Sequence, residues 1–346
     1  MATVTGKGFS CIAGVLFSII FLISCNRDTP SMVAIPDPLP SWNQGATKTS
    51  ILTFVDEATD PDSPDYIDVP DRVAVFDNDG TLWSEKPAYF QLFFAMDRVR
   101  ALAPGHPEWK DQQPYKAVLE NDLETLAGMG EHGILEIVMA THTGITTDEF
   151  EEEVTRWITT ARHPTLNRLY TDLVFQPMLE LMDLLRQNQF KVFIVSGGGI
   201  DFMRPWVEGI YGIPRDQVVG SSGATEYIAG EGSPRLIKKA EIDFINDKEG
   251  KPVGIHRFIG RKPVFAAGNS DGDLAMLQWT ASGPGKRFML YVHHTDGDRE
   301  WAYDRESSVG RLDKGLDEAL QKGWTVMDMK RDWRIIYPFQ LNKDIE

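Results

Sequence analysis

Four short apolar runs, each followed by polar or glycine residues, place the strongest constraint on the fold of this 346-residue chain. They cover residues 72–76, 190–195, 263–267 and 287–292, and three of them are nearly continuous in apolar side chains. Such runs are typical of strands that are buried on both faces of a parallel sheet. Because amphipathic stretches alternate with the runs, the sequence predicts an α/β fold with a Rossmann-like parallel sheet core.

The residues that directly follow three of these runs carry the candidate reactive groups. Residues 77–81 (Asp-Asn-Asp-Gly-Thr), 196–199 (Ser-Gly-Gly-Gly) and 268–273 (Gly-Asn-Ser-Asp-Gly-Asp) each begin where a run ends. In open α/β sheets the site lies beyond the carboxyl ends of the strands. We therefore expect these three segments to meet at one edge of the sheet.

The acidic residues of these segments favour a divalent cation. Asp77 and Asp79 are two positions apart, so on an extended strand they share a face. Two adjacent carboxylates repel each other, and a bound cation relieves that repulsion. Asp271 and Asp273 add further hard oxygen donors, which favour Mg²⁺.

The second segment and one lysine favour an anion beside that cation. Ser196, Gly197 and Gly198 precede an expected helix, an arrangement whose main-chain N–H groups can bind an anion. Lys251 adds a mobile positive charge. A cation held by carboxylates next to an anion site predicts transfer of a phosphoryl group.

The sequence resembles the haloacid dehalogenase superfamily, in its phosphatase branch, between about residues 70 and 295. The first family motif, a hydrophobic strand followed by Asp-x-Asp-Gly-Thr, is complete at residues 77–81. Ser196 matches the second motif, and the run Val-Ser-Gly-Gly around it is similar to the phosphoserine phosphatase group. Lys251 best matches the third motif, with Lys248 and Lys262 as alternatives.

The fourth motif matches residues 268–273 but departs from the family pattern. An acid usually follows its glycine, whereas Asn269 stands there in this chain. An amide oxygen can coordinate Mg²⁺ but carries no charge, so Asp271 or Asp273 is an alternative for the direct contact.

The resemblance implies a mechanism. Asp77 would attack phosphorus and form an aspartyl-phosphate, and Asp79 would protonate the leaving group and then activate water. Mg²⁺ would be held by Asp77, Asp79 and the loop of Asn269, Asp271 and Asp273. Ser196 and Lys251 would hold the phosphoryl oxygens. Since dehalogenases of the superfamily do not need the second acid, the presence of Asp79 favours a phosphatase.

A helical segment separates the first two motifs, and it resembles the cap domain of the family. We expect the cap at residues 85–171, inserted into a catalytic core of residues 51–84 and 172–346. Thr146 and Glu149 indicate a capping box. The stretches expected to be helical are residues 88–102, 115–127 and 147–160. The candidate substrate contacts are Glu85, His142 and Arg156 from this segment, with Gly197 and Gly198 from the core.

Two further sequence features concern the substrate and a possible second insertion. Glu85 lies near the place where phosphoserine phosphatases carry an acid for the substrate amine, so phosphoserine is one conceivable substrate. Residues 214–248 hold glycines and a proline between strand-like stretches, which indicates a small hairpin.

The N-terminal region reads as an export signal. Residues 1–24 have a basic residue and a short apolar run, and they end before Cys25 in a pattern that resembles a bacterial lipobox. Cys25 would be lipidated, and the proline-rich residues 25–50 would form a flexible tether. This predicts a bacterial cell-envelope lipoprotein that faces the periplasm or the cell surface, with outer-membrane sorting favoured by Asn26. An uncleaved anchor helix is the alternative.

Composition narrows the function. The formal net charge is −16, so nucleic acid is not expected as a partner. With two cysteines, the chain has neither a disulfide framework nor a cysteine-rich zinc site. The leading hypothesis is a Mg²⁺-dependent phosphatase of small phosphorylated metabolites. The alternatives are a non-catalytic binding or sensor lipoprotein and, with less support, a phosphotransferase or a haloacid dehalogenase.

Overall fold

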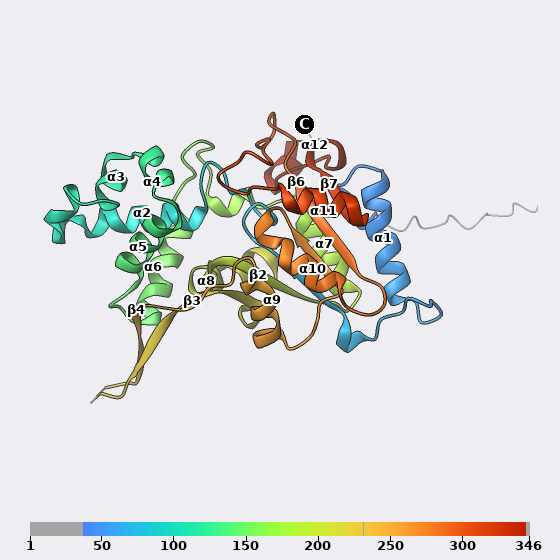
Figure 1. Ribbon diagram of the computed structural model, residues 1–346, viewed down its shortest axis with the longest axis horizontal. Coiled ribbons are helices and arrows are strands. Elements are labelled where there is room, and N and C mark those ends of the chain that lie inside the picture. The colour runs from blue at the N-terminus through green and yellow to red at the C-terminus, as the bar shows by residue number, and fades with distance from the viewer. Residues whose placement is uncertain (1–36, 231, 344–346) are drawn as a thin grey trace, which may run out of the picture. The chain divides into compact units, whose positions relative to one another are not determined.

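A seven-stranded sheet with the order β4-β3-β2-β1-β5-β6-β7 forms the centre of the fold (Figure 1). The computed structural model describes residues 37–230 and 232–343. Neighbouring strands are parallel except β3 and β4, which are antiparallel. The strands are β1 (Val73–Phe76), β2 (Lys191–Gly199), β3 (Val218–Ile228), β4 (Arg235–Phe244), β5 (Phe265–Gly268), β6 (Phe288–His293) and β7 (Thr325–Asp328).

The four strands predicted from apolar runs are confirmed as β1, β2, β5 and β6. The strand β1 lies at the centre, between β2 and β5, and all of its side chains are buried. Its side chains alternate between two apolar clusters, with Ala74 and Phe76 in one and Val73 and Val75 in the other. This alternation shows why the run is continuously apolar, because both faces of the sheet are covered.

Helices cover the two faces. The helices α1 and α7 contribute to the cluster that contains Phe76, whereas α10 and α11 contribute to the cluster that contains Val75. The helices are α1 (Ala46–Thr59), α2 (Phe90–Leu102), α3 (Tyr115–Glu120), α4 (Leu123–Gly128), α5 (Gly130–His142), α6 (Thr147–Thr160), α7 (Gln176–Gln187), α8 (Ile200–Tyr211), α9 (Gly250–Gly254), α10 (Leu274–Ala281), α11 (Lys314–Lys322) and α12 (Met329–Asp332).

The segment between β1 and β2 is helical, as expected for an inserted cap, and its helices α2 to α6 lie together beside the sheet (Figure 1). The capping box of α6 is confirmed, because Thr146 Oγ1 accepts from Glu149 N and the Glu149 carboxylate accepts from Thr146 N. The single helix predicted over residues 115–127 is wrong. Asn121 has a left-handed conformation (φ 58°) that ends α3 before α4 begins.

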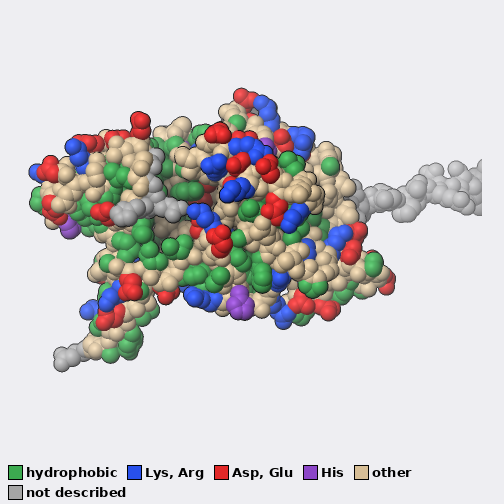
Figure 2. All heavy atoms as spheres, in the orientation of Figure 1, with side chains coloured by type: hydrophobic (Ala, Val, Ile, Leu, Met, Phe, Trp, Pro, Cys, Tyr) green, Lys and Arg blue, Asp and Glu red, His purple; other side chains and the backbone are tan. Residues whose placement is uncertain are grey.

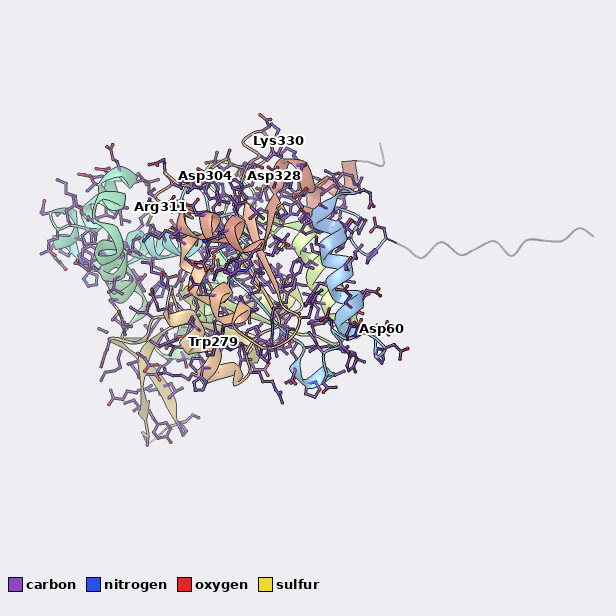
Figure 3. All side chains as sticks on the ribbon, turned by 45° about the vertical axis from the view of Figure 1, so that its right-hand side comes forward. Asp60, Trp279, Asp304, Arg311, Asp328 and Lys330 are labelled. Atoms are coloured by element: carbon purple, nitrogen blue, oxygen red, sulfur yellow. The ribbon has the colours of Figure 1, made fainter. Side chains whose placement is uncertain are left out.

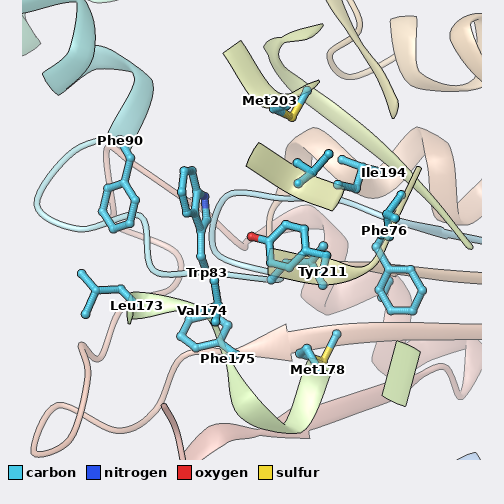
Figure 4. Packing of buried hydrophobic residues seen from close by; sticks show 14 of the residues in the cluster. Phe76, Trp83, Phe90, Leu173, Val174, Phe175, Met178, Ile194, Met203 and Tyr211 are labelled. Atoms are coloured by element: carbon cyan, nitrogen blue, oxygen red, sulfur yellow. The ribbon is translucent and has the colours of Figure 1, made fainter. Parts of the chain in front are cut away.

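Aromatic side chains join this helical segment to the core. Figure 4 shows Trp83, two residues after the first motif, near Phe90 of α2. The Trp83 ring is 4.7 Å from that of Phe90 and stacks at 4.5 Å on that of Trp206 in α8. The Tyr211 hydroxyl donates to Asn78 Oδ1 at 3.1 Å. These contacts fix the loop that follows β1.

The hairpin expected within residues 214–248 is present as β3 and β4, but it is not a separate element. Its first strand pairs in parallel with β2, so the hairpin continues the central sheet and its ribbon extends beyond the other strands (Figure 1). The strand β7 was not predicted, because its four residues carry too little apolar character to stand out.

The tether predicted for residues 25–50 is wrong for its second half. The chain forms two units, residues 1–37 and 38–346, and the elements described above belong to the second. Leu39 and Trp42 are buried, and Trp42 Nε1 donates to the Pro177 carbonyl at 2.9 Å. Because these apolar side chains are buried, the stretch is folded despite its prolines, and the folded core begins near residue 38 rather than 51.

The predicted signal peptide and Cys25 lie outside the described residues. Across residues 37–230 and 232–343, no helix has both the length and the hydropathy that crossing a membrane requires.

Candidate active site

The loop after β1 turns sharply at Gly80 and presents Asp77 and Asp79 at the carboxyl edge of the sheet. Gly80 has φ +72°, and a Cβ atom there would lie 2.0 Å from Asn269 Nδ2. Glycine is therefore required both by the backbone conformation and by the close approach of the fourth motif. The indole of Trp83 donates to Asp79 Oδ1 at 2.9 Å, which orients that carboxylate.

Lys251 joins the first and fourth motifs. It lies in α9, its side chain is buried, and its Nζ is 2.6 Å from Asp77 Oδ1 and 2.5 Å from Asp273 Oδ1. Of the three lysines considered for the third motif, Lys251 is thus the one that contacts the site aspartates. Lys262 instead donates to Ser282 Oγ, and Lys248 lies 4.0 Å from Asp247.

Burial and like charges shift the ionisation of this cluster. Burial, and then repulsion from Asp273, raise the pKa of Asp77 well above its usual range, although Lys251 opposes both effects. Burial lowers the pKa of Lys251, but the attraction of Asp273 and Asp77 outweighs it and raises the pKa overall. Lys251 therefore stays charged between the two carboxylates.

Asp79 has the ionisation that acid–base chemistry needs. Burial raises its pKa to about 6, with the hydrogen bond from Trp83 opposing the rise, and part of its surface still reaches solvent. A carboxyl group with a pKa near the working pH can both donate and accept a proton.

The second motif reaches the same place. Ser196 ends the buried part of β2, and its Oγ accepts from Gly198 N at 3.0 Å. A Cβ atom at Gly198 would lie 3.6 Å from Asp79 Oδ2, so the glycine turn and Asp79 are neighbours. The structure thus brings Asp77, Asp79, Ser196, Gly198 and Lys251 around one site, as predicted.

Two residues at this turn were missed by sequence reasoning. Gln91 of α2 accepts from Gly199 N at 2.7 Å, which ties the helical segment to the turn. Asp247 Oδ1 lies 3.3 Å from where a Cβ atom of Gly197 would be and 3.0 Å from that of Gly272. Neither residue belongs to a motif, and only the tertiary contacts identify them.

Two residues of the fourth motif that were predicted as metal ligands, Asp271 and Asp273, have protein partners instead. Asp271 does not face the site, since its carboxylate accepts from the main-chain N–H groups of Asp313 at 3.0 Å and Gly315 at 2.8 Å, at the start of α11. Asp273 Oδ2 accepts from Asn269 N and Ser270 N, and its other oxygen binds Lys251. Asp273 therefore acts through Lys251, and both of its oxygens are engaged.

The donors that remain fit Mg²⁺. Within the described ranges, no group of three or more His, Cys, Asp or Glu side chains is placed to share a metal ion. The Asp77 carboxylate, the Asp79 main-chain carbonyl and Asn269 Oδ1 are instead a mixed set of hard oxygen donors, the type that Mg²⁺ prefers. Asp77 and Asp273 also share the ammonium group of Lys251, with Asp79 beside them, and this gathering of acidic groups favours a cation.

Glu85 lies at the site but faces a protein partner. It is 1% exposed, and its Oε1 accepts from Asn269 Nδ2 at 2.7 Å and from the Tyr303 hydroxyl at 2.8 Å. Burial raises its pKa to about 7, and the nearby His294 opposes the rise. The His294 ring contacts the carbonyl of Gly80 through Nε2 at 2.7 Å, and this contact holds the turn of the first motif in place.

The other two candidate substrate contacts from the helical segment, His142 and Arg156, contact protein side chains instead. His142 is buried between the rings of Phe94 and Phe150, at centroid distances of 5.3 and 4.7 Å. Arg156 is exposed and pairs with Glu153 on its own helix. A histidine or arginine in a helical pattern does not reveal which face of the helix it occupies until the helices are packed.

Comparisons with known proteins agree with this geometry. A sequence model of the haloacid dehalogenase-like hydrolase family matches residues 74–278, which is more than half of the chain. A search of curated proteins finds no match.

Among solved structures, a conserved protein of unknown function from Anaerococcus prevotii has a TM-score of 0.55 at 16% identity, over 85% of this chain and 94% of that chain. A protein of unknown function from Bordetella pertussis has a TM-score of 0.46 at 14% identity, over 75% and 98% of the two chains. A phosphoserine phosphohydrolase-like protein from Francisella tularensis has a TM-score of 0.36 at 16% identity, over 72% and 99%. The first of these supports the fold. With the family match spanning all four motifs, the chain belongs to the haloacid dehalogenase-like hydrolases.

Proposed function

We propose that this hydrolase is a Mg²⁺-dependent phosphatase that cleaves small phosphomonoesters through an aspartyl-phosphate on Asp77. The observation that carries the proposal is the buried Asp77–Lys251–Asp273 arrangement with Asp79 beside it. Asp77 is a nucleophile held next to a cation, and Asp79 is an acid with a pKa of about 6. These are the two groups that cleavage of an alkyl phosphate requires.

In the first step, a carboxylate oxygen of Asp77 forms a bond to phosphorus while the bond from phosphorus to the ester oxygen breaks. The leaving oxygen takes its proton from the Asp79 carboxyl group. Water then attacks the phosphorus of the aspartyl-phosphate and transfers a proton to Asp79. Orthophosphate leaves and the Asp77 carboxylate is restored.

The other site residues would hold the phosphoryl group. Lys251, the Ser196 hydroxyl and the N–H groups of the glycine turn are the donors available to its oxygens. Bound Mg²⁺, held by Asp77, Asp79 and Asn269, would neutralise charge on the phosphoryl oxygens. Losing one preorganised donor costs on the order of 10²–10³ in rate.

The contacts of Glu85 argue against one substrate. The carboxylate of Glu85 already accepts from Asn269 and Tyr303, so it is not free to bind a substrate amine as in phosphoserine phosphatases. This disfavours phosphoserine. The formal net charge of −16 disfavours nucleic acid as a partner, and on the face shown in Figure 2 the Lys and Arg side chains lie among Asp and Glu side chains.

Release of orthophosphate from a chromogenic phosphomonoester by the full-length protein tests the proposal. The wild-type activity should depend on Mg²⁺ and disappear with EDTA. Asp77→Asn should abolish it, whereas Arg156→Ala, at an exposed ion pair within α6, should retain it. Absence of EDTA-sensitive activity across a broad panel of phosphomonoesters would favour the non-catalytic binding or sensor protein instead.

We also propose that Cys25 carries a lipid that anchors the protein in the bacterial envelope, on the periplasmic side or at the cell surface. The support is the apolar run and the residues that lead up to this cysteine. A Cys25→Ala variant should leave the membrane fraction after cell lysis. Retention in that fraction would instead favour the uncleaved anchor helix.

A further inference from the structure

We propose that Glu85 is a positioning residue that orients the amide of Asn269, so that its oxygen rather than its nitrogen faces the magnesium site. The inference rests on the proposed function. It gives Glu85 a role in holding a metal ligand rather than in binding the substrate. It explains how the fourth motif can work with an amide where the family pattern has an acid.

The hydrogen bonds fix the orientation. Asn269 Nδ2 donates to Glu85 Oε1 at 2.7 Å, and the Tyr303 hydroxyl donates to the same oxygen at 2.8 Å, so this carboxyl oxygen is the acceptor and the amide nitrogen faces it. The amide oxygen then points to the opposite side, where the Thr81 hydroxyl donates to it at 3.3 Å. Since an amide oxygen has two lone pairs, one remains for a cation.

The residues around Glu85 and Asn269 exclude solvent from the pair and leave space for both side chains. Glu85 is 1% exposed and Asn269 is also 1% exposed, so solvent cannot replace their contact. A Cβ atom at Gly80 would lie 2.0 Å from Asn269 Nδ2, and one at Gly310 would lie 1.8 Å from Glu85 Oε1. Glycine at both positions, each with positive φ, leaves the space that the two side chains occupy.

The pair also places an acidic group behind the amide. Asn269 brings no charge to the cation, whereas Glu85 places a carboxyl group one hydrogen bond behind it. An oxygen that accepts from the amide N–H polarises the amide and makes its oxygen a better donor to the metal. Outer partners of this kind typically change metal affinity by about 10–100-fold when removed.

Calorimetric titration of the full-length protein with Mg²⁺ tests the inference without any substrate. Glu85→Gln should bind Mg²⁺ about 10–100-fold more weakly than wild type. Glu153→Gln is the matched control, because it removes one carboxylate that pairs with Arg98 and Arg156 rather than with Asn269. Its Mg²⁺ affinity should match that of wild type.

A double variant tests orientation rather than charge alone. In Glu85→Gln with Asn269→Asp, the amide introduced at position 85 can donate to the carboxylate introduced at position 269, so the hydrogen bond is kept with donor and acceptor exchanged. We expect its Mg²⁺ affinity to return to within about threefold of wild type or to exceed it. The circular dichroism melting curve of each variant, measured without Mg²⁺, checks that it is folded.

The outcomes separate the two proposals. If wild type binds Mg²⁺ and hydrolyses phosphomonoesters but Glu85→Gln binds Mg²⁺ equally well, the role of Glu85 is overturned and the phosphatase stands. If the double variant stays as weak as Glu85→Gln, the orientation mechanism is wrong. If wild type binds no Mg²⁺, both proposals fail.

Discussion

Replacing Lys251 by methionine should damage both stability and catalysis, because this side chain is the cation between two buried carboxylates. Its Nζ lies 2.6 Å from Asp77 and 2.5 Å from Asp273, and the side chain is 2% exposed. Removing one partner of a buried ion pair typically costs about 3–5 kcal/mol, since the other charge is left uncompensated. We expect a loss of this size in the free energy of unfolding at pH 8 without Mg²⁺.

The loss in the free energy of unfolding caused by Lys251→Met should be smaller at lower pH. Without the ammonium, nothing opposes the burial of Asp77 or its repulsion from Asp273, so the folded-state pKa of Asp77, already raised in wild type, should rise further. A carboxyl group with a raised folded pKa favours folding when it is protonated, so its contribution is lost as the pH rises through that pKa. Lys251→Met should therefore differ less from wild type at pH 5.5 than at pH 8. Added Mg²⁺ should have the same compensating effect.

Urea unfolding at the two pH values measures the stability, and orthophosphate release measures the activity, which should fall by about 10²–10³. Lys262→Met is the matched control. Lys262 Nζ lies 3.7 Å from the centre of the ring of Trp279, an exposed residue of α10 that Figure 3 labels. Such a contact contributes about 0.5–1 kcal/mol. If Lys251→Met is as stable as Lys262→Met at both pH values, the ion-pair argument is wrong.

Two further predictions concern the helical segment. Burial lowers the pKa of His142 to about 3, so wild type should lose about 2 kcal/mol relative to His142→Gln between pH 7 and pH 5, as the unfolded chain takes up a proton that the buried ring cannot. Urea unfolding at both pH values checks this, and parallel losses in the two proteins would contradict it. Thr146→Ala should lower the free energy of unfolding by about 1 kcal/mol through loss of the α6 capping box. An unchanged urea midpoint would show that the box contributes nothing.

The strands of the core could be predicted because a strand that is buried on both faces carries apolar side chains at nearly every position. The strand β1 alternates its side chains between two apolar clusters, so every position is apolar. Local signals also predicted α6, whose capping box is complete within four residues. In contrast, Leu39 and Trp42 lie in a proline-rich stretch, and only their contacts with distant elements show that they belong to the core.

The sequence by itself determined where the chemistry lies along the chain. Parallel strands end at one edge, so acidic and glycine residues placed after β1, β2 and β5 had to meet there. It also identified the residue types that a cation and a phosphoryl group need.

Only the tertiary structure decided what each carboxylate faces. Asp271 and Asp273 are two residues apart and chemically identical, yet the first caps α11 and the second binds Lys251. Glu85 contacts Asn269 across 184 positions. The partners of a buried carboxylate come from elements far away in the chain, and a polar group is satisfied by whatever donors packing brings to it. For that reason the sequence placed these acids near the site, and the packing of the elements assigned their contacts.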